Sequence, residues 1–274
     1  VTFVASMLER VIEEQARGNP ALAESVRKEV VAVIGDDLSK VKPGSADAMR
    51  LKDVLVARKL WSQYLEVGIG PDAEIFTKSQ PMSAVGTGAE IGIHPQSEWN
   101  NPEPEIVLVV NSRGETVGAT LGNDVNLRDF EGRSALLLGK SKDNNGSTAI
   151  GPFIRLFDGT FTLDDVRRAD LTLTVSGDDG FVLKGASTMR EISRDPLDLV
   201  AQTTAMHQYP DGFVLFCGTL FAPTQDRGAP GSGFTHRVGD IVRIRSARRG
   251  GLVNRVELRE RLAFSSTQLK QAVQ

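Results

Sequence analysis

Two glutamates that stand close together in the sequence carry the clearest chemical signal. They alternate with prolines in the run Pro102-Glu103-Pro104-Glu105, directly before the apolar segment Ile106–Val110. Residues two apart on an extended chain point to the same face, so we expect the two carboxylates to lie side by side. Like charges this close repel each other unless a cation lies between them. The pair therefore indicates either a cation site or a solvated pair of edge charges.

A third carboxylate follows the next apolar segment. Asp124 stands shortly after Val117–Leu121. If this segment and Ile106–Val110 pair as a hairpin through the turn Ser112–Glu115, Asp124 comes to lie near the two glutamates. Three carboxylates with no histidine or cysteine nearby favour a hard cation, so we expect Mg²⁺, with Mn²⁺ or Ca²⁺ as alternatives. The alternative for Asp124 is a turn residue in a Gly-Asn-Asp turn.

The segment around Asp124 is unusually polar. Residues 123–131 contain four charged groups and two asparagines. A purely structural turn rarely needs so many polar groups, whereas binding residues concentrate on loops beside rigid elements. The segment therefore favours the cation site.

The elements that position these residues fall into two parts. Helical spacing of apolar residues predicts helices over Phe3–Ala16, Pro20–Ile34 and Ala46–Glu66. The sequence pattern then changes to short β-rich segments separated by turn residues. We therefore predict an α+β, β-rich chain with a helical N-terminal segment over residues 1–70, a catalytic β domain over 71–262 and a tail over 263–274.

The predicted β domain contains two helical pieces, Phe130–Gly139 and Pro196–His207, and the Arg248–Gly251 segment is expected to be a solvated hairpin turn. Its eight predicted strands are Glu90–Ile93, Ile106–Val110, Val117–Leu121, Ile154–Leu156, Leu171–Val175, Phe181–Lys184, Phe213–Phe216 and Ile241–Arg245. We expect an antiparallel or mixed sheet, which the helical segment caps or covers as a lid.

Composition excludes several classes of protein. The formal net charge of −3 gives no reason to expect nucleic acid or an anionic membrane as a partner. The single cysteine, Cys217, excludes an internal disulfide and fits a reducing compartment, so we expect a cytoplasmic protein. No apolar run reaches the roughly 18 residues that cross a bilayer. The chain begins at Val1 and not at Met, as expected for part of a longer protein.

Several runs, in sequence order, resemble the fumarylacetoacetate hydrolase superfamily from about residue 74 to residue 258. These runs are Glu-Pro-Glu-Ile-Val-Leu-Val-Val, Gly-Asn-Asp-Val-Asn-Leu-Arg-Asp, and Lys142 followed by Gly151-Pro152. Three further runs are most similar to the 2-keto-3-deoxy-pentonate dehydratases of this superfamily, those of 2-keto-3-deoxy-D-xylonate above all. They are Trp61–Val67, Asn126–Ser134 and His207–Phe213.

The resemblance implies a fold, a reaction and an assembly. The fold would be a mixed β-sandwich roll in which Glu103, Glu105 and Asp124 bind Mg²⁺ or a similar ion. The reaction would be metal-dependent dehydration of a small 2-oxo sugar acid, 2-keto-3-deoxy-D-xylonate or its C4 epimer, to 2-oxoglutarate semialdehyde in pentose catabolism. The assembly would be a homodimer or a homotetramer.

The resemblance also implies roles for five further residues. Lys142 falls on the active-site lysine of the family. Arg128 and Glu131 fall on polar positions of the site, and many hydrolases have glutamine at the second of these. Lys78 matches a lysine on the floor of the site, and Thr219 matches a threonine that contacts the substrate carboxylate.

One departure from the family pattern separates two reactions. Hydrolytic members carry an aromatic residue, a histidine and a glutamate at intervals of three in a mobile lid, where Phe3, Ser6 and Glu9 stand in this chain. Without the water-activating histidine, a dehydratase is favoured over a C–C hydrolase of acylpyruvates or 2,4-diketo-3-deoxy sugar acids. A non-catalytic module that binds a metal or a sugar acid is the second alternative, which Lys142 and Lys78 disfavour.

Proton transfer has two candidates. A carboxylate near an apolar lid can have a pKa raised toward neutrality, which makes Glu9 and Glu131 candidate acids or bases. The alternatives are that Glu9 faces solvent and that Glu131 forms an ion pair with Arg128 or Arg133. Lys142 is expected to stabilise an enolate oxygen or to orient the substrate carboxylate.

Overall fold

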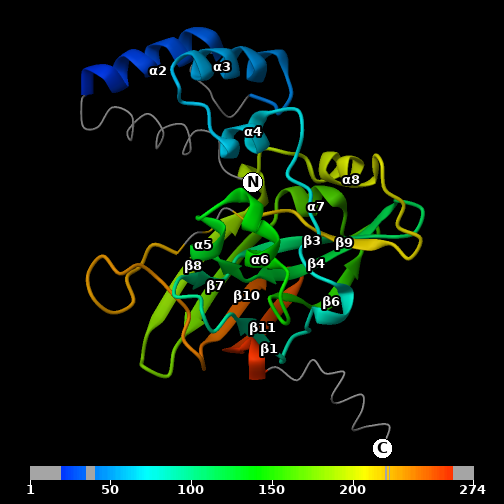
Figure 1. Ribbon diagram of the computed structural model, residues 1–274. Coiled ribbons are helices and arrows are strands. Elements are labelled where there is room, and N and C mark those ends of the chain that lie inside the picture. The colour runs from blue at the N-terminus through cyan, green and yellow to red at the C-terminus, as the bar shows by residue number, and fades with distance from the viewer. Residues whose placement is uncertain (1–19, 35–40, 220, 222, 262–274) are drawn as a thin grey trace, which may run out of the picture. The chain divides into compact units, whose positions relative to one another are not determined.

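The computed structural model describes residues 20–34, 41–219, 221 and 223–261 (Figure 1). The chain divides into two compact units. The helical unit comprises Val1–Ile75 and Glu191–Gln208, and the β unit comprises Phe76–Arg190 and Tyr209–Gln274. The predicted helix Phe3–Ala16, with Phe3, Ser6 and Glu9, lies outside the described residues.

The helical unit packs around its own apolar core. Its helices are α2 (Pro20–Ile34), α3 (Ala46–Ala57), α4 (Gln63–Ile69) and α8 (Pro196–Thr204). The prediction for Pro20–Ile34 is confirmed at both ends. The buried core residues of this unit are Val26, Val30, Val41, Ala48, Leu51, Leu55, Leu60, Leu65 and Ile69.

The prediction of one helix over Ala46–Glu66 is wrong, because the chain turns between α3 and α4. Lys59 takes a left-handed conformation with φ of 59°, and the amide of Leu60 donates to the carbonyl oxygen of Leu55 at 2.7 Å. This turn buries Leu60. The hydroxyl of Ser62 then caps α4 by accepting a hydrogen bond from its first turn.

Arg194 ties the two parts of the helical unit together. Its buried guanidinium Nη2 donates to the carbonyl oxygens of Val67, Gly70 and Asp72 at 3.0, 2.8 and 2.9 Å. Val67 belongs to the last turn of α4, and Gly70 and Asp72 follow that helix, so these are acceptors that lack helical partners. The arginine therefore fixes the exit of the chain from this helix.

The β unit contains two larger sheets and a short two-stranded ladder. The five-stranded sheet has the order β1-β11-β10-β7-β8, the four-stranded sheet has the order β6-β4-β3-β9, and β2 pairs with β5. The bounds are β1 (Glu90–Ile93), β2 (Asn100–Asn101), β3 (Pro104–Val110), β4 (Thr116–Asp124), β5 (Asn126–Leu127), β6 (Thr148–Leu156), β7 (Asp170–Ser176), β8 (Val182–Thr188), β9 (Phe213–Phe216), β10 (Ile241–Ser246) and β11 (Gly250–Leu258).

The five-stranded sheet is mixed, the four-stranded sheet is antiparallel, and the two pack against each other. β1 and β11 are parallel, whereas the other strand pairs are antiparallel. β11 contacts β6 and β10 contacts β4, which joins the two larger sheets. β3 and β4 are buried along nearly their whole length. The residues at the ends of this central pair are therefore held in a rigid frame.

Each of the eight predicted strands coincides with or overlaps an observed strand, but β11 and the two-residue strands β2 and β5 were not predicted. The expectation of a solvated turn at Arg248–Gly251 is wrong for Arg249. This residue is 1% exposed, and its guanidinium lies 5.3 Å from the ring centroid of Phe161. The predicted helix Pro196–His207 is confirmed as α8, which ends at Thr204.

The helical piece predicted around Phe130–Gly139 is confirmed in part, because the helical conformation is broken into short turns. The structure has a short α5 (Arg128–Glu131), a 3-10 turn over Ala135–Leu137 and then α6 (Leu138–Lys142), whereas α7 (Leu163–Arg167) lies further along. Gly132 follows the end of α5. The hydroxyl of Ser134 accepts from the amide of Leu136 and starts the next turn. Lys142 is thereby the last residue of α6.

The helices of the described segments are all too short or too polar to cross a membrane.

Candidate metal centre

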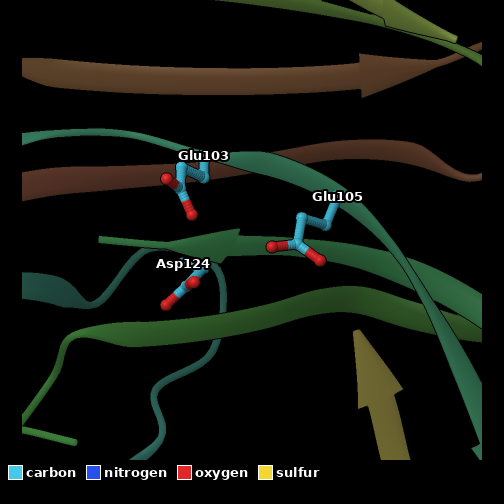
Figure 2. A group of neighbouring side chains, drawn as sticks. All are labelled: Glu103, Glu105 and Asp124. Carbon is cyan, nitrogen blue, oxygen red and sulfur yellow. The ribbon is translucent and has the colours of Figure 1, made fainter. Parts of the chain in front are cut away.

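The β3–β4 hairpin brings the three carboxylates together, as predicted. Glu105 pairs with Gly122 across the two strands, and the amide of Asp124 donates to the carbonyl oxygen of Glu103 at 3.0 Å. One carboxylate oxygen from each of Glu103, Glu105 and Asp124 lies within 4.8 Å of the others (Figure 2). The hairpin register is therefore what assembles the cluster.

The cluster is buried, which excludes a solvated pair of edge charges. The side chains of Glu105 and Asp124 are 1% and 0% exposed, and that of Glu103 is 17% exposed. Three buried like charges are tolerated only when cations lie among them.

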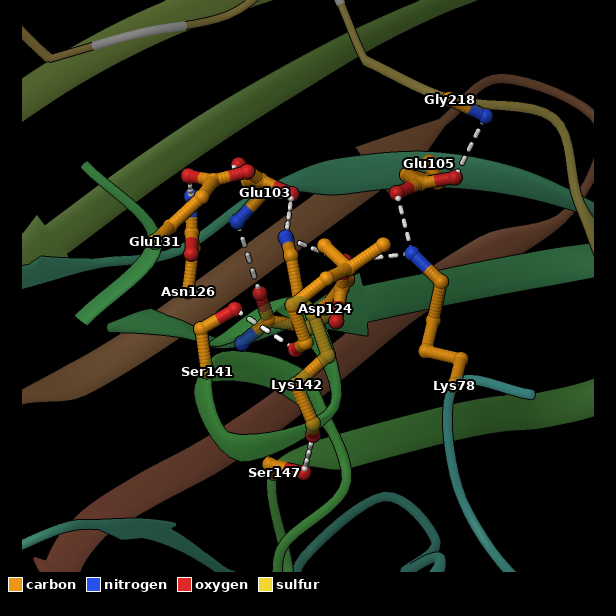
Figure 3. A network of polar contacts seen from close by, with 12 residues as sticks. Lys78, Glu103, Glu105, Asp124, Asn126, Glu131, Ser141, Lys142, Ser147 and Gly218 are labelled. Carbon is orange, nitrogen blue, oxygen red and sulfur yellow. Dashed lines mark hydrogen bonds and ion pairs between the residues drawn. The ribbon is translucent and has the colours of Figure 1, made fainter. Parts of the chain in front are cut away.

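Two lysines supply positive charge to the cluster (Figure 3). Lys142 Nζ lies 2.6 Å from Glu103 Oε2 and 2.7 Å from Asp124 Oδ2. Lys78 Nζ lies 3.3 Å from Glu105 Oε1 and also donates to Asp124 Oδ2. Both ammonium groups therefore share one oxygen of Asp124, and the cluster retains one formal negative charge.

The electrostatics of the cluster favour charged lysines and a charged aspartate. Burial disfavours the ammonium form of Lys142, but Asp124 and Glu103 outweigh it and raise the pKa of this lysine. The pKa of Lys78 is raised in the same way, against its burial, by Asp124 and Glu105. Burial of Asp124 is outweighed by the two lysines, which lower its pKa.

Glu103 behaves differently from Asp124. Burial raises its pKa to about 7, and Lys142 opposes this rise only in part. Without a further cation, Glu103 thus takes up a proton more readily than Asp124 does. A divalent cation at this position would favour the ionised form.

The backbone fixes Glu105. The amide of Gly218, which follows β9, donates to Glu105 Oε2 at 2.6 Å, and Lys78 binds the other oxygen. Gly218 has φ of 91°, a conformation that favours glycine.

The residues present fit a hard divalent cation. Asp124 Oδ1 is buried and has no hydrogen-bond partner among the described residues, so one oxygen of the cluster lacks the partner that a buried acceptor requires. The donor set consists of carboxylate oxygens alone, the set that Mg²⁺, Mn²⁺ and Ca²⁺ prefer. Glu103, Glu105 and Asp124 are therefore the candidate ligands.

Glu131 and Arg128 have other contacts than those expected. Glu131 Oε2 accepts a hydrogen bond of 2.6 Å from Nδ2 of Asn126. Within the described residues, Glu131 forms no ion pair with Arg128 or Arg133. The guanidinium of Arg128 instead lies 4.3 Å from the ring centroid of Trp99, a cation–π contact.

Thr219 follows Gly218 directly, and its hydroxyl accepts a hydrogen bond of 3.0 Å from the amide of Phe221. The structure thus brings Lys78 and Lys142 into contact with the cluster and puts Thr219 next in sequence to a residue that contacts it. Phe3, Ser6 and Glu9 lie outside the described residues.

Sequence reasoning missed two contacts of the cluster. Asn126 Nδ2 also donates to Glu103 Oε1 at 3.0 Å. The spacing of two residues that predicts neighbouring carboxylates for the two glutamates also relates Asp124 to Asn126. The sequence could therefore have indicated this contact. The Gly218 amide carried no side-chain signal, because a backbone donor is the same in every residue except proline.

Comparison with known proteins assigns the family. The family described as "Fumarylacetoacetate (FAA) hydrolase C-terminal" matches residues 59–257. The chain therefore belongs to this family, which confirms the resemblance and accounts for its mixed helix and strand content.

Two relatives carry more specific names. The 2-dehydro-3-deoxy-D-arabinonate dehydratase of Saccharolobus solfataricus is 31% identical over 192 residues, or 69% of this chain and 60% of that protein. The probable 2-keto-3-deoxyxylonate dehydratase of Haloferax volcanii is 32% identical over 193 residues, or 70% of this chain and 63% of that protein. The chain thus spans about three fifths of the length of these relatives.

A solved structure agrees with these relatives. It is named 2-keto-3-deoxy-D-arabinonate dehydratase complexed with magnesium and 2,5-dioxopentanoate, and it shares 31% identity with this chain at a TM-score of 0.62. The match covers 72% of this chain and 67% of that one. The apo form of the dehydratase has a TM-score of 0.65 at 30% identity.

Proposed function

We propose that this chain is the catalytic part of a metal-dependent dehydratase. Its substrate would be 2-keto-3-deoxy-D-xylonate or the C4 epimer 2-keto-3-deoxy-D-arabinonate, and its product 2,5-dioxopentanoate, which is 2-oxoglutarate semialdehyde. The observation that carries the proposal is the buried cluster of three carboxylates and two lysines. Relatives about 31% identical, named as dehydratases of these two acids, support the choice of substrate.

The reaction releases one molecule of water. C3 loses a proton and C4 loses its hydroxyl group, which leaves a double bond between C3 and C4. A proton then leaves C5 and another is added at C3, so the double bond moves to C4 and C5. The resulting enol tautomerises to the C5 aldehyde.

Glu103, Glu105 and Asp124 would hold the divalent cation. The bound ion would supply Lewis acidity at the 2-oxo group, which acidifies the protons on C3. Gly218 and Lys78 orient Glu105 by binding its two oxygens.

Lys142 would stabilise negative charge that develops on the 2-oxo oxygen. Its raised pKa keeps the ammonium group charged at neutral pH, and its position at the end of α6 is fixed by a hydrogen bond of 2.5 Å from the Ser147 hydroxyl to its carbonyl oxygen. A fixed positive charge at the site of developing negative charge lowers the barrier most effectively when water is excluded.

Glu131 would transfer the protons at C3, with Glu9 of the N-terminal segment as the second candidate. Glu131 lies beside Glu103 through their shared partner Asn126, which supports this assignment. Thr219 and Arg128 would bind the substrate carboxylate and the polar groups at its other end. We also propose that residues 1–70 form a lid in which Phe3 and Ser6 lie at the substrate. The protein would assemble as a homodimer or a homotetramer.

The proposal is tested by following 2-oxoglutarate semialdehyde formation from each C4 epimer with Mg²⁺, with EDTA, and after Mg²⁺ is restored. We expect turnover that EDTA abolishes and Mg²⁺ recovers. Pyruvate release from an acylpyruvate, without dehydration of either epimer, would assign the chain to the hydrolases instead.

A further inference from the structure

Asn126 contacts two carboxylates to which the proposed reaction gives different tasks. Its amide Nδ2 donates to Glu103 Oε1 at 3.0 Å and to Glu131 Oε2 at 2.6 Å (Figure 3). A primary amide nitrogen carries two hydrogens, so both are used. Because ionised carboxylates only accept, the nitrogen and not the oxygen of this amide faces them.

The two carboxylates depend on Asn126 to different degrees. Glu103 is held from two sides, since Lys142 binds its other oxygen. For Glu131, the bond from Asn126 is the one side-chain hydrogen bond found in the described part of the chain. The position of Glu131 relative to the candidate metal ligands therefore rests on this amide.

Asn126 is itself rigidly placed. It is 3% exposed and lies in β5, where it pairs with Asn101 of β2. The preceding residue, Val125, donates its amide to the carbonyl oxygen of Ser147 at 2.8 Å. A buried side chain on a doubly held backbone can orient its neighbours without moving itself.

We propose that Asn126 is a positioning residue that couples Glu131 to the metal-ligating Glu103. It holds the proton-transferring carboxylate at a fixed place beside the cation, so that both act on the same end of the substrate. This inference rests on the proposed dehydration. The contact of Asn126 with Glu103 also predicts an effect on metal affinity, which can be measured without turnover.

The variants Asn126→Ala and Asn126→Asp separate this role from packing. Alanine removes both donors, and we expect kcat and the affinity for Mg²⁺ each to fall by about 10- to 100-fold, as for other partners of metal ligands. KM should change by less than about threefold, because Asn126 does not bind the substrate directly. Aspartate keeps the shape but repels both carboxylates, so it should impair kcat at least as much as alanine does. If Asn126 acts only through packing, Asn126→Asp should impair kcat less than Asn126→Ala does.

A double-mutant cycle with Glu131→Gln tests the coupling. If Asn126 acts on catalysis through Glu131, adding Asn126→Ala to Glu131→Gln should lower kcat far less than it does in the wild type. Affinity for Mg²⁺ is measured in parallel by titration calorimetry, and Glu131→Gln alone should leave it unchanged. The matched control is Asn101→Ala. Asn101 lies in the same ladder, and its buried side-chain amide donates to the carbonyl oxygen of Pro102.

Each outcome decides the inference. It is overturned if Asn126→Ala binds Mg²⁺ and turns over like the wild type, or if its kcat loss is the same with Gln at position 131. It is also overturned if Asn101→Ala has the same effects on affinity and kcat. Should the wild type bind Mg²⁺ without dehydrating either epimer, the proposed function fails, whereas calorimetry still decides whether Asn126 holds Glu103.

Discussion

The ammonium group of Lys142 lies 2.7 Å from Asp124 Oδ2, and both side chains are almost wholly buried. Because Lys78 binds the same oxygen, Asp124 is the charge on which both lysines depend. Removing one partner of a buried ion pair leaves the other charge uncompensated, which is far more destabilising than losing a surface pair.

We expect Asp124→Asn to abolish Mg²⁺ binding and dehydration and to lower the free energy of unfolding by about 3 kcal/mol. Calorimetry with Mg²⁺ and urea unfolding measure the two effects. The control is Asp178→Asn, the same change at a side chain that is 82% exposed. Wild-type Mg²⁺ affinity in Asp124→Asn would remove this residue from the ligand set.

Lys78→Met should strengthen metal binding while it impairs the reaction. Lys78 Nζ contacts Glu105 and Asp124, so its positive charge competes with a cation for the same oxygens. We expect the affinity for Mg²⁺ to rise by at least about tenfold, or about 1.4 kcal/mol, with kcat reduced. Lys184→Met, at an exposed lysine of β8, should change neither quantity. A weaker affinity in Lys78→Met would mean that the lysine supports the metal site instead of competing for it.

Removal of the metal should inactivate the protein without unfolding it. The two lysines already neutralise most of the cluster charge, unlike a structural zinc site whose ligands have no other partners. We expect far-UV circular dichroism in EDTA to equal that in Mg²⁺, with a midpoint of thermal unfolding that falls only by the binding free energy of the ion. Loss of secondary structure in EDTA would show that the ion is needed for folding.

Stability should fall as the pH drops below neutrality, and His236 should contribute to this fall. Its side chain is fully buried, with Nδ1 3.3 Å from Asp240 Oδ2, and burial lowers its pKa from 6.5 despite that aspartate. Below about pH 6.5 the unfolded chain binds a proton that the folded protein does not, so the unfolding free energy decreases by up to about 1.4 kcal/mol per pH unit.

Urea unfolding of the wild type and of His236→Gln between pH 7.5 and pH 5.5, as rough limits around the ordinary histidine pKa, measures this contribution. Both buffers contain excess Mg²⁺, because a bound cation would keep the carboxylate cluster ionised. The variant should show a shallower decrease than the wild type, and His207→Gln, at an exposed histidine, should not. Equal slopes for the wild type and His236→Gln would contradict the prediction.

The sequence predicted well those elements whose pattern is local. The bounds of α2, β1 and β9 were obtained from apolar spacing and turn residues alone. β11 escaped because Asn254, at one of its buried positions, breaks the apolar alternation. Its amide is satisfied in the structure by the carbonyl oxygens of Gly86 and Ala89 at 2.9 Å each. Such a polar core position is stable only with partners far away in sequence.

The carboxylates of the site were also predictable, because strand spacing and one hairpin bring them together. The two lysines were predicted from the resemblance to the family, because they come from separate segments of the chain. The break at Lys59 had no clear signal, since lysine rarely adopts a left-handed conformation. The contact from Gly218 could not be read from side chains, because tertiary structure alone aims its amide at Glu105.

The contact of Gly218 with Glu105 has an evolutionary consequence. Any residue except proline carries the amide donor, so this position supplies no chemistry that another residue lacks. What it requires is the backbone conformation, with φ of 91°, which costs a residue with a Cβ roughly 1 kcal/mol or more. Selection at position 218 would therefore act on the backbone conformation that directs the amide, and not on the chemical reactivity of the residue. A substitution there would leave every functional group of the site present and would move one of them.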